Sequence, residues 1–177
     1  KQDKLVVVVK YQSEADAYHQ LYKDKYGARL YSGTLRQNNL GYKVDPSGQV
    51  EYYRVDKAGR YTLQDGKPVL TNRKNGIPIR ALEYERLVFQ NNPEARMIVV
   101  SEDVGTFGVT FTAATAMVLD DLPETYTRLY QLWDRIHRID RHHPKEEVRY
   151  YRLEARFPQE YIESRDWPDE EKAWFRL

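Results

Sequence analysis

The sequence predicts an α+β domain with a mixed, largely antiparallel sheet, three to four helices and a β-hairpin arm. Two observations predict this class: strand-length apolar runs and helical patterns lie toward both ends of the chain, and a Gly-turn-rich stretch separates them. The chain has 177 residues and no low-complexity linker, so we expect one domain over residues 1–177. A start at Lys1 in place of Met suggests a fragment or processed part of a larger chain.

The first elements are a strand, a helix and a second strand. Leu5–Val9 is a run of β-branched residues, which is typical of a strand buried on both faces. Ser13 followed by Asp16 has the spacing of a capping box, and Gly27 stands where a helix C-terminus requires glycine, so we expect a helix between them. A strand over 28–34 should follow.

The middle of the chain is punctuated by turn sequences. Asp-Pro-Ser-Gly at 45–48, Lys-Ala-Gly at 57–59 and Asp-Gly at 65–66 are flanked by Tyr, Val and Thr residues. Closely spaced turns between β-forming residues indicate hairpins. We therefore expect an antiparallel arm over 42–70, followed by a polar loop over 71–76.

The residues after the polar loop have the patterns of two helices longer than ten residues and of several strands. Pro78 begins a helix that runs to about Asn91, and strands follow at 97–100 and 105–111. Residues 113–119 are expected to form a short helix. The strongest helix covers 123–141, with Tyr, Leu, Trp and Ile on one face, and a last strand covers 148–157.

Missing motifs exclude several kinds of chemistry. The chain has no cysteine, no Walker A loop, no Gly-x-Gly-x-x-Gly, no His-Glu-x-x-His and no Gly-x-Ser-x-Gly. His137 and His142 are five residues apart and do not share a helical face, so no metal is expected. The net charge of +1 disfavours attraction of the whole molecule to nucleic acid or a membrane, and only a local patch could bind them.

Two segments resemble the ADP-ribosyltransferase and NAD-hydrolase toxin fold. Residues 29–34 read Arg-Leu-Tyr-Ser-Gly-Thr, and residues 107–113 read Phe-Gly-Val-Thr-Phe-Thr-Ala. In that family a strand reading roughly Tyr-(Arg or His)-Gly-Thr binds nicotinamide and ribose, and a later strand supports it. The resemblance covers about fifteen residues, and Ser32 stands where the family has Arg or His.

The resemblance implies an NAD-consuming effector or toxin domain that performs ADP-ribosyl transfer or NAD hydrolysis, with NAD as substrate. A glutamate would orient the ribose. It implies a protein target or a cognate inhibitor protein as partner, and a soluble domain that acts in the cytoplasm or is delivered into a target cell, although the compartment cannot be determined from the sequence. The implied NAD-binding residues are Arg29, Tyr31, Gly33, Thr34, Arg36, Thr110 and Thr112, and the implied catalytic residues are Glu154 and Glu171.

Two functions without catalysis remain open. The chain has 17 Arg and 15 Tyr, and both residue types suit a module that binds protein or nucleic acid. Nucleic acid is the less favoured partner because Glu146 and Glu147 dilute the basic end of the 123–141 helix. Alternatively, the arm over 42–70 would be a contact element in a larger particle, since its strands can pair edge to edge.

Overall fold

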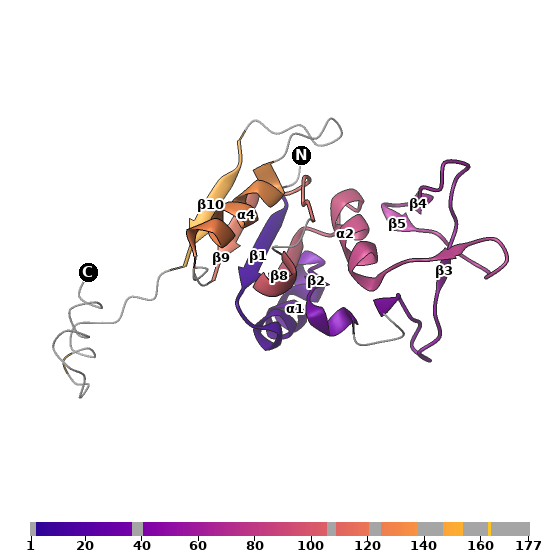
Figure 1. Ribbon diagram of the computed structural model, residues 1–177, viewed down its shortest axis with the longest axis horizontal. Helices are drawn as coiled ribbons and strands as arrows, with labels where there is room; N and C mark the ends of the chain where they lie inside the picture. Colours follow the sequence, from indigo (N-terminus) through magenta and orange to yellow (C-terminus); the bar gives the residue numbers. More distant parts are fainter. Residues whose placement is uncertain are drawn as a thin grey trace.

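The computed structural model describes residues 3–36, 41–105, 109–120, 125–137, 147–153 and 163. A five-stranded sheet lies between helices, and an arm of short strands extends beyond α2 at one side (Figure 1). The α+β class with mixed sheets and a β arm is therefore confirmed.

The five-stranded sheet is parallel throughout. Its strands are β1 (Leu5–Val9), β2 (Arg29–Tyr31), β8 (Met97–Ser101), β9 (Ala116–Leu119) and β10 (Arg149–Arg152), in the order β10-β9-β1-β8-β2. Strands that run parallel in one sheet require long crossover connections, which is why the connections from β1 to β2 and from β9 to β10 contain helices. The antiparallel pairs lie in the arm, and the sequence pattern did not indicate that the longer ladders would be parallel.

Alternate residues of β1 enter two cores. Val6 and Val8 belong to the core formed with α2 and α4, whereas Val7 and Val9 belong to the core formed with α1. The four valines are 0 to 5% exposed. A strand buried on both faces has no polar side to alternate with, which accounts for the continuous apolar run in the sequence.

Three of the four helices in the described part match predicted helices with shifted bounds, and the short third helix was not predicted. The four helices are α1 (Gln12–Tyr26), α2 (Ala81–Asn91), α3 (Glu102–Gly105) and α4 (Tyr126–His137), with a 3₁₀ turn at Gly33–Arg36. Gly27 ends α1 with a φ of 56°, as predicted. The predicted cap was wrong: α1 begins before Ser13, and the Tyr11 backbone N–H donates to Glu14 Oε2 at 3.0 Å.

The arm consists of β3 (Tyr52–Tyr53), β4 (Leu63–Gln64), β5 (Lys67–Pro68), β6 (Leu70–Thr71) and β7 (Ile77–Pro78). β3 pairs antiparallel with β6 and β7, and β4 pairs antiparallel with β5. The antiparallel arm is confirmed, and it extends past the expected end to include β7. Tyr53 is 2% exposed and contacts Tyr84 of α2, with the ring centroids 5.5 Å apart.

Two predicted elements were wrong. The strand expected at 105–111 is absent from the described part of that segment, where α3 ends at Gly105 and residues 109–111 form no strand. The helix expected at 113–119 is instead the strand β9, in which Met117 and Leu119 are buried and Ala116 and Val118 are half-buried. This alternation of half-buried and buried residues has the period of two that is typical of a strand. The last predicted strand is β10, and residues 154–157 lie outside the described part.

None of the helices in the described ranges is long and apolar enough to cross a membrane.

Candidate functional site at the carboxyl edge of the sheet

The carboxyl ends of four parallel strands bring polar residues to one edge of the sheet. β1, β2, β8 and β9 run in the same direction, and each is followed by polar residues: Lys10 after β1, Ser32 after β2, Glu102 after β8 and Asp120 after β9. In open parallel sheets, ligands bind outside this edge because the connections diverge there toward both faces. We therefore treat this edge as the candidate site.

A buried carboxylate holds an arginine at this edge. Glu102 follows β8 directly, and its side chain is 8% exposed. Arg128, near the start of α4, donates from Nη1 to Glu102 Oε1 at 3.2 Å, and its own side chain is half exposed. A guanidinium has five N–H donors, so Arg128 retains donors for an anion. The pair places an oriented positive group at the edge.

Ser101, the residue before Glu102, carries an unsatisfied hydroxyl. Its residue is fully buried, and its Oγ has no hydrogen-bond partner among the described residues. A buried hydroxyl without a partner costs free energy, roughly 1 to 3 kcal/mol, unless a further group binds it. Two consecutive residues at the end of β8 therefore carry polar groups: the hydroxyl of Ser101, which has no partner among the described residues, and the carboxylate of Glu102.

The end of β2 packs against the first turns of α1. Thr34 Oγ1 donates to Asp16 Oδ1 at 3.3 Å, and its backbone N–H donates to Ser32 Oγ at 3.4 Å. A Cβ on Gly33 would lie 2.4 Å from Nε2 of Gln12, so the glycine permits this close approach. Gly33 and Thr34, which sequence analysis selected, thus lie at the candidate edge.

Arg29 lies at the start of β2 and is paired with a buried glutamate. Its Nε and Nη2 donate to Glu85 Oε2 of α2 at 2.6 and 2.5 Å. Burial raises the pKa of the Glu85 carboxyl, and the charges of Arg29 and Lys43 oppose that rise. The ion pair of Arg29 and Glu85 therefore joins β2 to α2. It lies at the opposite end of β2 from Gly33 and Thr34.

The two segments of the family resemblance meet through an aromatic contact. Tyr31 and Phe111 are both buried, and their rings pack edge to face with centroids 5.4 Å apart. Thr110 and Thr112 turn to α2 instead: Gln90 Nε2 donates to the Thr110 carbonyl at 3.3 Å and to Thr112 Oγ1 at 3.1 Å.

The remaining predicted residues cannot be placed as side chains. Glu154 and Glu171 lie outside the described residues, and for Arg36 the structure describes only the backbone of the 3₁₀ turn. No group of three His, Asp or Glu side chains that could hold a metal occurs in the described ranges.

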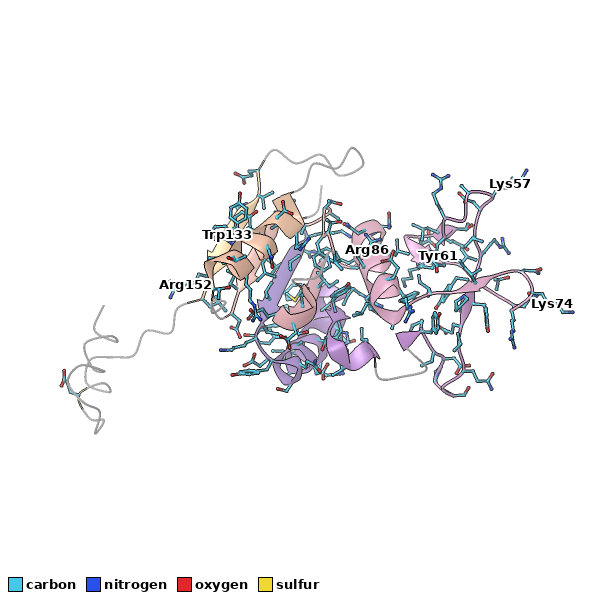
Figure 2. All side chains as sticks on the ribbon, viewed as in Figure 1. Lys57, Tyr61, Lys74, Arg86, Trp133 and Arg152 are labelled. Carbon is cyan, nitrogen blue, oxygen red and sulfur yellow. The ribbon has the colours of Figure 1, made fainter. Side chains whose placement is uncertain are left out.

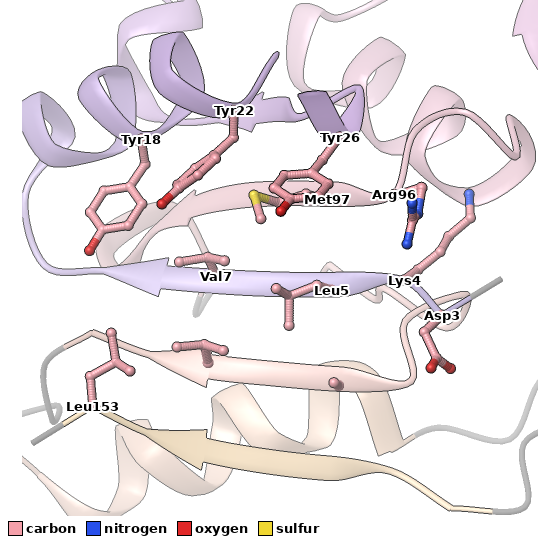
Figure 3. Close-up of a pocket in the computed structure, with 12 residues that line it drawn as sticks. Asp3, Lys4, Leu5, Val7, Tyr18, Tyr22, Tyr26, Arg96, Met97 and Leu153 are labelled. Carbon is pink, nitrogen blue, oxygen red and sulfur yellow. The ribbon is translucent and has the colours of Figure 1, made fainter. Parts of the chain in front are cut away.

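A separate groove of about 460 Å³ lies on the α1 face of the sheet. Figure 3 shows Tyr18, Tyr22 and Tyr26 in a row along α1, opposite the side chains of Leu5 and Val7 on β1. The Tyr18 hydroxyl donates to Asp120 at 3.0 Å. Most of the lining is aliphatic or aromatic and offers packing area, and three charged residues, Asp3, Lys4 and Arg96, also line the groove.

Sequence analysis missed Ser101, Glu102 and Arg128. The available signal was positional: Ser101 and Glu102 end a predicted strand, and residues at strand ends face a ligand when the strands are parallel. Because hairpins were expected, this signal was not used. Arg128 is 26 residues from Glu102 in the sequence, and the packing of α4 on the sheet brings them together.

The fold has a match among solved structures. The chain is similar to the crystal structure of the C-terminal part of the Fun30 ATPase domain, with a TM-score of 0.54 and 12% sequence identity. The match covers 99% of this chain and 39% of the solved chain, so this chain spans about two-fifths of that structure. No protein-family model matches the chain, and no curated protein sequence matches it. At this identity the likeness shows the fold alone.

Proposed function

We propose that this chain is one half of an ATP-hydrolysing unit, with the carboxyl edge of its sheet facing the nucleotide. The observation that carries the proposal is the fold likeness over 99% of the chain to the C-terminal part of an ATPase domain. The direction of the five parallel strands supports it, since their shared carboxyl edge is where such sheets bind ligands.

Arg128 is the residue that would contact phosphate. A guanidinium binds phosphate oxygens through paired N–H groups, and in phosphoryl transfer a positioned arginine stabilises the charge of the transition state. Glu102 is a positioning residue in this proposal because it binds the guanidinium and limits its rotation. The Ser101 hydroxyl would supply a further hydrogen bond.

The phosphate-cradling loop belongs to a second unit in this proposal. The sequence contains no Walker A loop, so the backbone amides that hold the β- and γ-phosphates would come from a partner half. This half would then close over the nucleotide and supply the cation. We expect the chain alone to hydrolyse ATP slowly or not at all.

The test is ATP hydrolysis by the native protein purified from its source. Arg128→Ala should lower kcat by about 1,000-fold or more if the arginine stabilises the transition state, and Arg128→Lys should not restore it fully. Arg60→Ala is the matched control, because it removes an exposed arginine of the arm.

Glu102→Gln keeps the size of the side chain and weakens the ion pair. It should lower kcat less than Arg128→Ala does, with little change in KM. No ATP hydrolysis by the native protein, or equal kcat values for wild type and Arg128→Ala, would reject the proposed function.

NAD consumption stays a second hypothesis. The Tyr31–Phe111 contact favours it, because this contact joins the two segments on which the resemblance rests. Incubation of the protein with NAD should then release nicotinamide, and Glu154→Gln or Glu171→Gln should abolish the release. ATP hydrolysis without nicotinamide release would decide between the two functions.

A further inference from the structure

The arm carries a positive charge that the whole molecule does not show. Residues 42–80 contain eight Lys and Arg residues against four Asp and Glu residues, a formal net charge of +4, whereas the complete chain has +1. The remainder of the chain is therefore net negative. This is the kind of local patch through which a nearly neutral protein can still bind a polyanion.

Five of these cations are exposed and have no acidic partner. Arg54, Lys57, Lys67, Arg73 and Lys74 are exposed, and none of them has an ion pair among the described residues. Figure 2 shows Lys57 and Lys74 at two separate tips of the arm, away from the sheet. We call these five residues the arm cations.

Two of the four acids of the arm, Asp45 and Asp56, are hydrogen-bonded within its turns. Asp45 Oδ1 accepts the backbone N–H groups of Ser47 and Gln49, both at 2.9 Å. Asp56 accepts the N–H groups of Ala58 and Arg60 and pairs with the Arg60 guanidinium. These hydrogen bonds lower the pKa of both carboxyls. The negative charges of Asp45 and Asp56 are thus held close to the backbone, whereas the arm cations are exposed to solvent.

The arm presents its cations on a fixed backbone. The Arg54 backbone N–H donates to the Val69 carbonyl and the Thr62 N–H donates to the Arg54 carbonyl, both at 2.9 Å. Gly66 lies so close to the end of α2 that a Cβ there would be 2.4 Å from backbone atoms of Asn91 and Asn92. Cations held on a braced element lose less conformational entropy on binding than cations on a loose loop.

We propose that the arm binds the sugar-phosphate backbone of nucleic acid through the arm cations. Lys and Arg distributed over several turns match a ligand whose negative charges repeat along a chain. Leu63, Leu70 and Ile77 are exposed between them and provide apolar area for the sugar and base faces. The proposal goes beyond the proposed ATP hydrolysis and does not depend on it.

The test is fluorescence anisotropy with a labelled 20-base-pair DNA duplex and a 20-nucleotide single strand of mixed sequence. The titration with the 177-residue chain is repeated between 50 and 200 mM NaCl. The arm variant carries Lys57→Ala, Arg73→Ala and Lys74→Ala together. If each cation neutralises one phosphate, the slope of log K against log salt on the duplex should become shallower by about 2.7, and by about 2.1 on the single strand. Affinity at 100 mM NaCl should fall at least tenfold.

The matched control variant carries Lys23→Ala, Lys25→Ala and Arg96→Ala. It removes the same charge from exposed positions outside the arm and should leave the salt slope unchanged. Circular dichroism checks that both variants fold. Three results would overturn the proposal: no binding of either probe at 50 mM NaCl, equal loss in the control variant, or equal competition by polyglutamate of the same charge. The last result would assign the arm to an acidic protein.

Discussion

Removal of the Arg29 guanidinium should leave the buried carboxylate of Glu85, between β2 and α2, without its ion-pair partner. The Glu85 side chain is 12% exposed, and Arg29 donates to its Oε2 from both Nε and Nη2. In Arg29→Met the methionine fills much of the space but donates nothing. We expect a loss of about 3 to 5 kcal/mol in the free energy of unfolding at pH 8, which is the usual cost of breaking a buried pair from one side.

Urea unfolding followed by circular dichroism measures this loss. With an m-value of about 2 kcal/mol per molar urea, the midpoint should fall by roughly 1.5 to 2.5 M. The loss should depend on pH, because burial raises the pKa of Glu85 and the variant lacks the arginine that opposes the rise. The folded variant then binds a proton more readily than the unfolded chain. Its stability therefore decreases as pH rises from the unfolded value of 4.5 through the folded pKa, and the penalty is absent below both values.

The double variant Arg29→Met with Glu85→Met tests the physical reason. With both charges removed, no buried charge is left unpaired, and stability should return to within about 1 kcal/mol of wild type or exceed it. If the double variant lost as much as the two single variants together, the two charges would not be coupled and the reasoning would be refuted.

Three further predictions concern the frame of the fold. Gly66→Ala should destabilise the protein by more than 2 kcal/mol in thermal unfolding, because its φ is 73° and α2 blocks a Cβ. Gly59→Ala, with a φ of 76° and open space, should cost only about 1 kcal/mol; equal losses would mean that the arm does not rest on α2. Burial lowers the pKa of Lys4 to about 8, so the unfolded chain binds this proton more readily and stability should rise between pH 8 and 10.5. Lys4→Met should remove that rise in urea titrations, and an unchanged pH profile would contradict the assignment. Phe111→Ala should cost about 3 to 5 kcal/mol in urea unfolding, and a loss below 1 kcal/mol would show that the ring is not a core residue.

Local chemistry made part of the candidate site predictable. Gly33 and Thr34 were selected from sequence, and both lie at the carboxyl edge of the sheet. Arg29 was selected as an anion-binding residue, yet it pairs with Glu85, because the sequence does not reveal that α2 places a carboxylate beside it. Arg128 acquires its orientation only from Glu102, a contact between distant segments.

The sequence by itself determined those elements whose backbone conformation depends on only a few neighbouring residues. The valine run of β1, the Gly27 end of α1 and the turn sequences of the arm all form as predicted, since steric preference and local hydrogen bonds decide them. Tertiary structure alone decided that the five long strands run parallel, because strand direction depends on how crossovers pack and not on the residues of a strand. It also decided that Arg128 of α4 reaches Glu102 at the end of β8, since these two residues come from segments far apart in the sequence.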